Sequence, residues 1–321
     1  MPGFTTHYLF GVNTYKSLRN DALKKIIFNH HAAYSLGQQG PDIFFYYLPS
    51  YVLHKNNIGS VAHIQDTGKF LSYLIESRKL FPDKREEAIA QAYIMGFIGH
   101  YLLDRRCHPY IYYRSHFQGK RPDYYGSHMN LEVAVDAELL AYYKDIQPSA
   151  FRQNETIMLT KAEVRTIATI LYYVYSMTYP ELKVTYADMR LAIRSIQAGT
   201  RFLHDPHGKK KVITRKIEAL TLGYPVLSPM MASDALLFYR DPLNLLHREW
   251  RNPWDQHQSS SESFFELMDE TQEEYVKLLR KLHRLFAADK NSETERLQLQ
   301  MLLQTLGNQS YHSGLVADGV N

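Results

Sequence analysis

The sequence predicts an all-α protein, and three observations support this prediction. Apolar residues recur at helical spacing over several long segments, as in helices that bury one face. Alternating apolar and polar runs separated by hairpin turns, which would predict strands, are absent from the sequence. The composition is 45% apolar and 22% charged, which is typical of a folded globular protein and excludes a disordered or collagen-like chain.

In chain order, helices are predicted over residues 66–80, 85–106, 129–144, 161–179, 186–204 and 262–288. The segment 85–106 illustrates the reason, because it begins with acidic residues, ends with two arginines and is largely apolar between them. This arrangement complements the helix dipole, which favours negative charge at the amino end and positive charge at the carboxyl end. Three other segments follow the same pattern, namely 129–144, 161–179 and 262–288.

Turn-forming residues predict loops between these helices, at 37–42, 114–127, 145–156, 205–211 and 252–263. The last of these loops divides the chain into a predicted main helical domain, 1–255, and carboxyl-terminal helices, 256–306, that pack on it. We expect the segment 307–321 to be a disordered tail. The run Lys209–Lys211 could contact phosphate, although three lysines in a loop more often form a solvated surface.

Charge and cysteine content restrict the classes of partner and compartment. Cys107 is the only cysteine, which excludes a disulfide scaffold. The net charge of +4 is a mild bias toward anionic partners and falls short of a nucleic-acid-binding footprint. No apolar run approaches the roughly 20 residues that cross a bilayer, and residues 1–30 lack the pattern of a signal peptide. The sequence therefore predicts a cytoplasmic protein without a transmembrane segment.

Two histidine–carboxylate pairs have the spacing that places two metal ligands on one helix face. His100 precedes Asp104 by four residues, and His128 precedes Glu132 by four. Chance alone gives one or two such pairs among 15 histidines and 33 acidic residues, so the spacing is not informative by itself. Apolar residues surround both pairs, however, and a carboxylate there is costly unless it is paired or bound to metal. A buried ion pair in each helix is the alternative.

Other candidate ligands lie near these pairs or before them in the chain. His108 follows Asp104 by four residues, and Asp136 extends the polar stripe that begins at His128 and Glu132. Earlier candidates each have an ordinary structural explanation. Asp42 suits a helix N-cap, His63 suits a core histidine, and His7 near the amino end is equally ambiguous.

Taken in order, these residues resemble the ligand pattern of the zinc-dependent phospholipase C family, which shares its fold with single-strand-specific zinc nucleases. The resemblance covers roughly residues 1–145 and is carried by the sequences THYLFG, GPDIFF, AHIQD, GHYLLD, CHPY and SHMNLE. Eight ligand-type residues in the family's order form a specific match, although no single one does. The resemblance implies a multi-helix bundle with a multinuclear metal site at one end.

The resemblance also implies a ligand set for each metal ion. One zinc ion would be held by Asp42, His63, His100 and Asp104. A second would be held by His108, His128 and Glu132. A third would use His7 and a bridging Asp104, a site that secreted members complete with a processed amino-terminal residue. The residues available here in place of that one are Met1, Pro2, His30 and His31.

The function implied by the resemblance is metal-dependent hydrolysis of a phosphodiester or phospholipid, with metal-activated water attacking phosphorus. Asp42 would orient or deprotonate that water. Three ligand carboxylates against two zinc ions leave a net charge of +1, which would attract a phosphodiester. Because free phospholipase activity in the cytoplasm would attack the cell's own membrane, a soluble phosphodiester is the more credible substrate there.

Two alternatives to this enzyme remain open. One is a single-strand nuclease of the same fold, against which the modest charge and the lack of a basic stripe argue weakly. The other is a non-catalytic helical protein that binds zinc for structure. Aromatic residues near the motifs do not choose between them, because such rings can hold a choline group, stack on bases or simply pack between helices.

Overall fold

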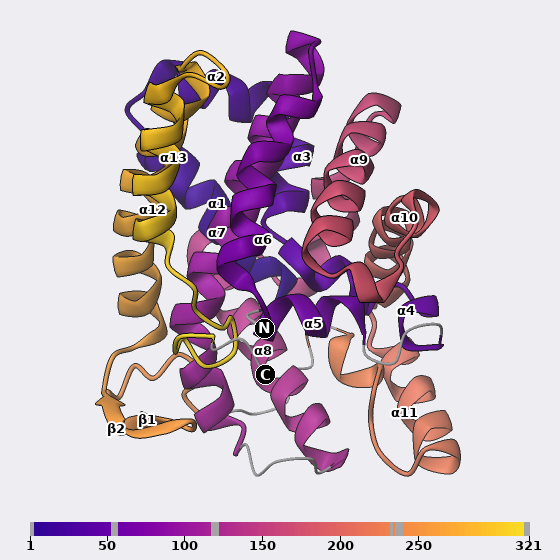
Figure 1. Ribbon diagram of the computed structural model, residues 1–321. Helices are drawn as coiled ribbons and strands as arrows, with labels where there is room; N and C mark the ends of the chain where they lie inside the picture. The colour runs from indigo at the N-terminus through magenta and orange to yellow at the C-terminus, as the bar shows by residue number, and fades with distance from the viewer. Residues whose placement is uncertain (1–2, 53–56, 117–121, 232–233, 235–239, 318–321) are drawn as a thin grey trace.

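The computed structural model describes residues 3–52, 57–116, 122–231, 234 and 240–317. Helices make up most of this part of the chain, which confirms the predicted all-α fold (Figure 1). The α-helices are α1 (Phe4–Ser17), α2 (Asp21–Asn29), α3 (His31–Gly37), α4 (Pro49–Val52), α5 (Ile58–Ile64), α6 (Thr67–Glu76), α7 (Lys84–Arg114), α8 (Pro122–Lys144), α9 (Lys161–Thr178), α10 (Tyr186–Leu203), α11 (Lys209–Thr221), α12 (Phe264–Ala287) and α13 (Glu293–Leu306).

Short elements connect these helices. The 3-10 helices are η1 (Gly40–Phe45), η2 (Ser77–Leu80), η3 (Pro148–Ala150), η4 (Gln153–Ile157), η5 (Pro180–Leu182) and η6 (Ser228–Met230). A small antiparallel hairpin is formed by β1 (Trp250–Asn252) and β2 (Asp255–Ser260). β2 lies within the segment 252–263 that was predicted to be a loop, and this polar, mostly exposed strand lacks the apolar alternation that predicts strands.

The 31-residue helix α7 forms the centre of the fold. The Asp83 carboxylate accepts hydrogen bonds from the backbone N–H groups of Arg85 and Glu86, which caps its amino end. Its buried positions run from Ile89 to Ile111 and lie on every side of the helix. Neighbours therefore surround it: α3, α1 and α8 pack on it, with α12 on one side and α9 on the other (Figure 1).

Two glycines bring α3 unusually close to α7. A Cβ atom on Gly37 would lie 2.3 Å from the carbonyl oxygen of Tyr93, and one on Gly96 would lie 2.2 Å from that of Tyr34. Only residues without a side chain allow this approach of the two backbones. The contact fixes η1, which follows α3, against the middle of α7. At Gly40, where φ is +48°, a side chain would collide with the His100 ring.

The segment 307–317 is folded, so the predicted disordered tail is wrong for these residues; 318–321 lie outside the described part. Tyr311 is fully buried, and its N–H donates to the carbonyl of His63. Pro109 lies inside α7 and has no N–H, so it cannot donate the usual helical hydrogen bond to the carbonyl of Arg105. Gly314 of the tail, with a φ of +65°, lies against that carbonyl. Because the segment is polar and contains glycine, its sequence did not indicate that Tyr311 would be buried.

Most predicted helices are present, with shifted ends. The segment 85–106 continues to Arg114, and 129–144 begins earlier, at Pro122. Lys209–Lys211, predicted to lie in a loop, instead begin α11. The helices α1 to α5 and α13 did not stand out in the sequence, because most of them are short. Within the described residues, no helix is both long and apolar enough to cross a membrane.

The packing of the tail can be tested by replacing its anchor. We expect Tyr311→Ala to lower the free energy of unfolding by about 3 to 5 kcal/mol, because it removes a large, fully buried ring. The matched control is Val316→Ala in the same segment, where the side chain is 67% exposed and the change should stay within about 0.5 kcal/mol. Equal, small effects in denaturant unfolding of both variants would show that the tail does not pack on the core.

Candidate metal centre

Five elements bring the eight predicted ligand residues to one buried place. α1 supplies His7, η1 supplies Asp42, and α5 supplies His63; α7 and α8 supply the rest. All eight side chains are buried. Their donor atoms form three compact groups, His7–Asp42–His100, His63–His100–Asp104 and His108–His128–Glu132, with the atoms of each group within 4.8 Å of one another.

The four residues that the resemblance assigns to one ion lie at the spacing of a coordination shell. His63 Nε2 is 3.2 Å from Asp42 Oδ1 and 3.5 Å from Asp104 Oδ2. His100 Nε2 is 3.9 Å from Asp42 Oδ1 and 3.1 Å from Asp104 Oδ2. A tetrahedral ion with bonds of about 2.1 Å would hold its ligand atoms about 3.4 Å apart. The observed distances lie on both sides of this value.

Backbone carbonyls fix which ring nitrogen of His63, His100 and His108 faces the centre. The Nδ1–H groups of His63 and His100 donate to the carbonyls of Gly59 and Gln38, at 2.7 and 3.1 Å. His108 Nδ1 donates to the Tyr311 carbonyl at 2.5 Å. Because a neutral imidazole carries one proton, Nε2 of each ring keeps its lone pair for a cation.

The group His108–His128–Glu132 combines one residue of α7 with two residues of α8. His128 Nε2 is 2.8 Å from Glu132 Oε1, one turn along α8. The His128 ring lies 6.3 Å from that of His108, which α7 contributes from one turn beyond Asp104. Asp104 Oδ2 is 3.7 Å from His108 Nδ1, so this carboxylate lies between the two groups.

His7 approaches the other oxygen of Asp104. Its Nε2 atom is 3.0 Å from Oδ1, while Oδ2 faces His63 and His100. The His7 ring also stacks on that of His100, with centroids 4.3 Å apart. Asp104 thus has the geometry of a bridging carboxylate. His30 and His31 lie elsewhere: His30 faces Glu163, and His31 is exposed on α3.

Unsatisfied polar atoms show that these residues suit a cation. Several buried atoms of this centre make no hydrogen bond among the described residues, including both ring nitrogens of His7, both oxygens of Asp104, Oδ1 of Asp42, and Nε2 of His63, His100 and His108. Buried polar atoms are nearly always hydrogen-bonded in proteins. A cluster of carboxylate oxygens and imidazole nitrogens matches the preferences of Zn²⁺, so the residues fit the metal that the sequence predicted.

Burial and the carboxylates divide the histidines by charge. Burial lowers the pKa of His7, His108 and His128, which keeps these rings neutral at pH 7. Burial also acts to lower the pKa of His63, but Asp104 and Asp42 more than offset it and raise the pKa to about 9. His7, His108 and His128 are therefore already deprotonated at neutral pH, whereas His63 is protonated.

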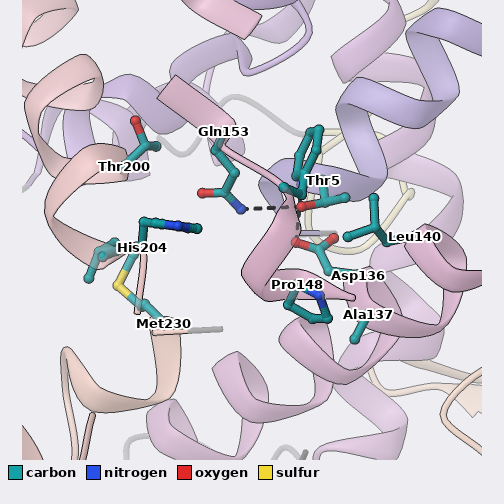
Figure 2. A pocket seen from close by; sticks show the side chains of 11 residues that line it. Thr5, Asp136, Ala137, Leu140, Pro148, Gln153, Thr200, His204 and Met230 are labelled. Carbon is teal, nitrogen blue, oxygen red and sulfur yellow. Dashed lines mark hydrogen bonds between the residues drawn. The ribbon is translucent and has the colours of Figure 1, made fainter. Parts of the chain in front are cut away.

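Asp136 is a structural neighbour of the centre. Its oxygens accept hydrogen bonds from the N–H groups of Thr5 and Thr6 and from the Thr6 hydroxyl, at 2.6 to 3.1 Å, which caps the start of α1, three residues before His7. Figure 2 shows Asp136 beside Thr5. Burial raises the pKa of Asp136 to about 6 despite these bonds. The polar stripe of α8 thus has two tasks, because Glu132 joins the centre and Asp136 fixes the helix that carries His7.

A cavity of about 200 Å³ opens onto the centre. Asp42, His128 and Glu132 reach its wall from the ligand set. The rest of the wall is mainly aromatic and apolar, formed by Gly3, Phe4, Gln39, Phe45, Tyr46, Ser60, Tyr112, Met129, Met230 and His312. Neither lysine nor arginine lines this cavity in the described part of the chain.

His312 is a further residue of the site, which the sequence analysis missed. Its ring lies 5.3 Å from that of His63 and 5.6 Å from that of His108, and it lines the cavity. It sits in the tail that was expected to be disordered. The histidine itself was the only available signal, and a lone histidine next to serine and glycine predicts no site.

One comparison with known proteins is informative. The sequence model of a family described as zinc dependent phospholipase C matches residues 6–190, which is more than half of the chain. This span includes all eight predicted ligand residues and ends before α11 and the tail. Neither the curated proteins nor the solved structures contain a match to the chain.

The bridging position of Asp104 gives a test by metal analysis. We expect Asp104→Asn to lose more than one equivalent of zinc, because the amide removes the charge from both oxygens between the groups. Glu295→Gln is the matched control: this carboxylate is equally buried but pairs with Arg78, away from the centre. Loss of one ion or none from Asp104→Asn, in elemental analysis of folded protein, would exclude a shared ligand.

The raised pKa of His63 gives a second test. In metal-free protein, protonated His63 contributes stability below pH 6.5 that is lost as the pH rises through about 9. Zinc must displace that proton, so we expect its binding at pH 7 to 8 to release about one proton and its affinity to rise about tenfold per pH unit up to pH 9. Calorimetric titrations in two buffers with different ionisation heats measure the release. Zinc binding that is independent of pH over this range would contradict the carboxylate–His63 contact.

Proposed function

The chain belongs to the zinc-dependent phospholipase C family, and we propose from this that it hydrolyses a phosphodiester of phospholipid headgroup size. The observation that carries the proposal is the convergence of eight buried ligand-type residues at one end of a 200 Å³ cavity. Family membership supports a metal-dependent, phospholipase-type hydrolase. The particular reaction and substrate argued below go beyond it.

In this proposal, each of the three ligand sets implied by the family resemblance holds one cation. Asp42, His63, His100 and Asp104 hold the first; His108, His128 and Glu132 hold the second; His7 and Asp104 would contribute to a third. Bound zinc would lower the pKa of a water toward about 7 and withdraw negative charge from phosphate oxygens. Open ligand positions are expected at the second and third cations, because His108, His128 and Glu132 supply only three protein ligands, and His7 and Asp104 supply only two.

Asp42 is proposed to act on the attacking water. Its Oδ1 atom faces His63 and His100, and the side chain also reaches the cavity wall. A carboxylate in that position can accept a hydrogen bond from water and hold it in line with phosphorus. Of the eight residues, only Asp42, His128 and Glu132 line the cavity, so the phosphate is expected to enter on this side.

The cavity wall favours a phospholipid-like diester over a nucleic acid. Phe45, Tyr46 and Tyr112 offer aromatic faces, which suit a quaternary ammonium group and apolar glycerol carbons. A single-strand nuclease usually follows the backbone with a basic groove, and no lysine or arginine lines the described part of this cavity. The non-catalytic alternative would leave the cavity and the aligned Asp42 without a role.

Two substrates assayed together test the proposed reaction. We expect the zinc-loaded protein to hydrolyse p-nitrophenyl-phosphorylcholine and not single-stranded DNA, and to lose the activity with a chelator. His128→Ala should reduce kcat/KM by about a hundredfold or more, because it removes a ligand that also lines the cavity. The control His257→Ala removes an exposed histidine of the hairpin and should leave the rate unchanged.

The opposite outcomes identify the other candidates. Cleavage of the DNA in preference to the choline ester would make the chain a nuclease. Turnover of neither substrate by protein with full metal content would favour a structural role for the metal. Full activity and full metal content in His128→Ala would exclude the proposed second group.

A further inference from the structure

Helix α11 exposes the apolar face that a helix usually buries. Ile213, Ile217 and Leu220 lie four and three residues apart, which places them along one side of the helix. Their side chains are 59%, 55% and 87% exposed. They are not isolated surface residues, because three large apolar side chains share a single stripe of one helix.

The side of α11 that faces the protein is polar. Glu218 is its only residue classed as buried, and the Glu218 carboxylate accepts hydrogen bonds from the N–H groups of Val226, Leu227 and Ser228 and from the Ser228 hydroxyl. At about 100° per residue, Glu218 lies nearly opposite the stripe of Ile213 and Leu220. Glu218 therefore holds α11 against the protein through hydrogen bonds, and the apolar side chains of the helix do not take part in this contact.

Basic residues border the exposed stripe. The helix contains Lys209, Lys210, Lys211, Arg215 and Lys216 against the single acid Glu218, a net charge of +4 that equals that of the whole chain. Lys209 and Lys216 lie on the same side as Ile213, three or four residues from it. Both are exposed, so their carbon chains can lie along the stripe while the ammonium groups extend beyond it.

We propose that α11 docks the protein on the surface of an anionic phospholipid membrane. An apolar stripe bordered by lysines is the arrangement of helices that lie in the plane of a bilayer, with the stripe among the acyl chains and the cations at the headgroups. A second copy of the chain is a poorer occupant, because a symmetric contact would bring two helices of charge +4 together.

The position of α11 connects this surface to the cavity. After α11 the chain runs into η6, which packs on both α11 and α8. Met230 of η6 lines the cavity, and α8 carries His128 and Glu132. Figure 1 shows α11 at the edge of the molecule, far from α12 and α13. Docking through α11 would therefore place lipid headgroups beside the entrance used by a headgroup-sized substrate.

Vesicle sedimentation tests the docking surface directly, with the zinc-loaded full chain. We expect strong binding to phosphatidylcholine vesicles that contain about 30% phosphatidylglycerol, and at least tenfold weaker binding to vesicles of phosphatidylcholine alone. Binding should also weaken at about 1 M salt. Because sedimentation requires no turnover, the outcome does not depend on whether the chain hydrolyses either assayed substrate.

Matched variants separate α11 from surface hydrophobicity in general. The triple change Ile213→Gln, Ile217→Gln and Leu220→Gln should reduce vesicle binding about tenfold or more, and so should Lys209→Gln with Lys216→Gln. All these side chains are exposed, so folding should be preserved. The control Leu297→Gln with Met301→Gln removes two exposed apolar residues of α13, a helix with one arginine against two glutamates, and should bind like the parent.

Three results would overturn the proposal. The first is equal binding by the α11 variants and the α13 control. The second is binding that ignores the anionic lipid and the salt. The third is a change of oligomeric state in the triple variant, by light scattering, with vesicle binding unchanged; that result would assign the stripe to a second copy of the chain.

Discussion

The structure depends on one electrostatic constraint: carboxylate oxygens and imidazole nitrogens are buried close together, and several of these atoms make no hydrogen bond among the described residues. Asp104 exposes no surface, and neither of its oxygens accepts a hydrogen bond from the described residues. An unpaired buried carboxylate is among the costliest groups a protein can contain. A cation held between these groups would offset this cost, and the ligand side chains come from five separate elements. Metal and fold are therefore expected to stabilise one another.

The apolar scaffold serves this constraint by fixing backbone positions. The close approach at Gly37 and Gly96 sets η1 against α7, and the missing side chain at Gly40 leaves room for the His100 ring. Carbonyl groups then orient the histidines, so that each Nε2 atom points inward. The outer end of the fold is built differently. There α11 is held through Glu218, and its apolar residues remain available for another partner.

The sequence was sufficient for the fold class, for most long helices and for the grouping of eight ligand-type residues. The pairs on α7 and α8 could be predicted because helical spacing fixes the distance between side chains four residues apart. The contributions of His7, Asp42 and His63 depended on the family resemblance, because tertiary packing alone brings them together. His312 could not be predicted, since its position follows from the burial of Tyr311 in a segment of polar composition. The orientation of α11 could not be predicted either. Amphipathic spacing shows that apolar residues share one side of a helix, but it does not show whether that side faces the protein or the solvent.

The hydrogen bond from His108 to the Tyr311 carbonyl joins residues 203 positions apart. During synthesis on a ribosome, His108 leaves the exit tunnel long before its carbonyl partner has been translated. The nascent chain can form the helical scaffold, but it lacks the group that orients this histidine until residue 311 emerges. A polypeptide that lacks residue 311 would therefore lack the acceptor that orients His108, so the helices α1 to α8 cannot complete this contact by themselves.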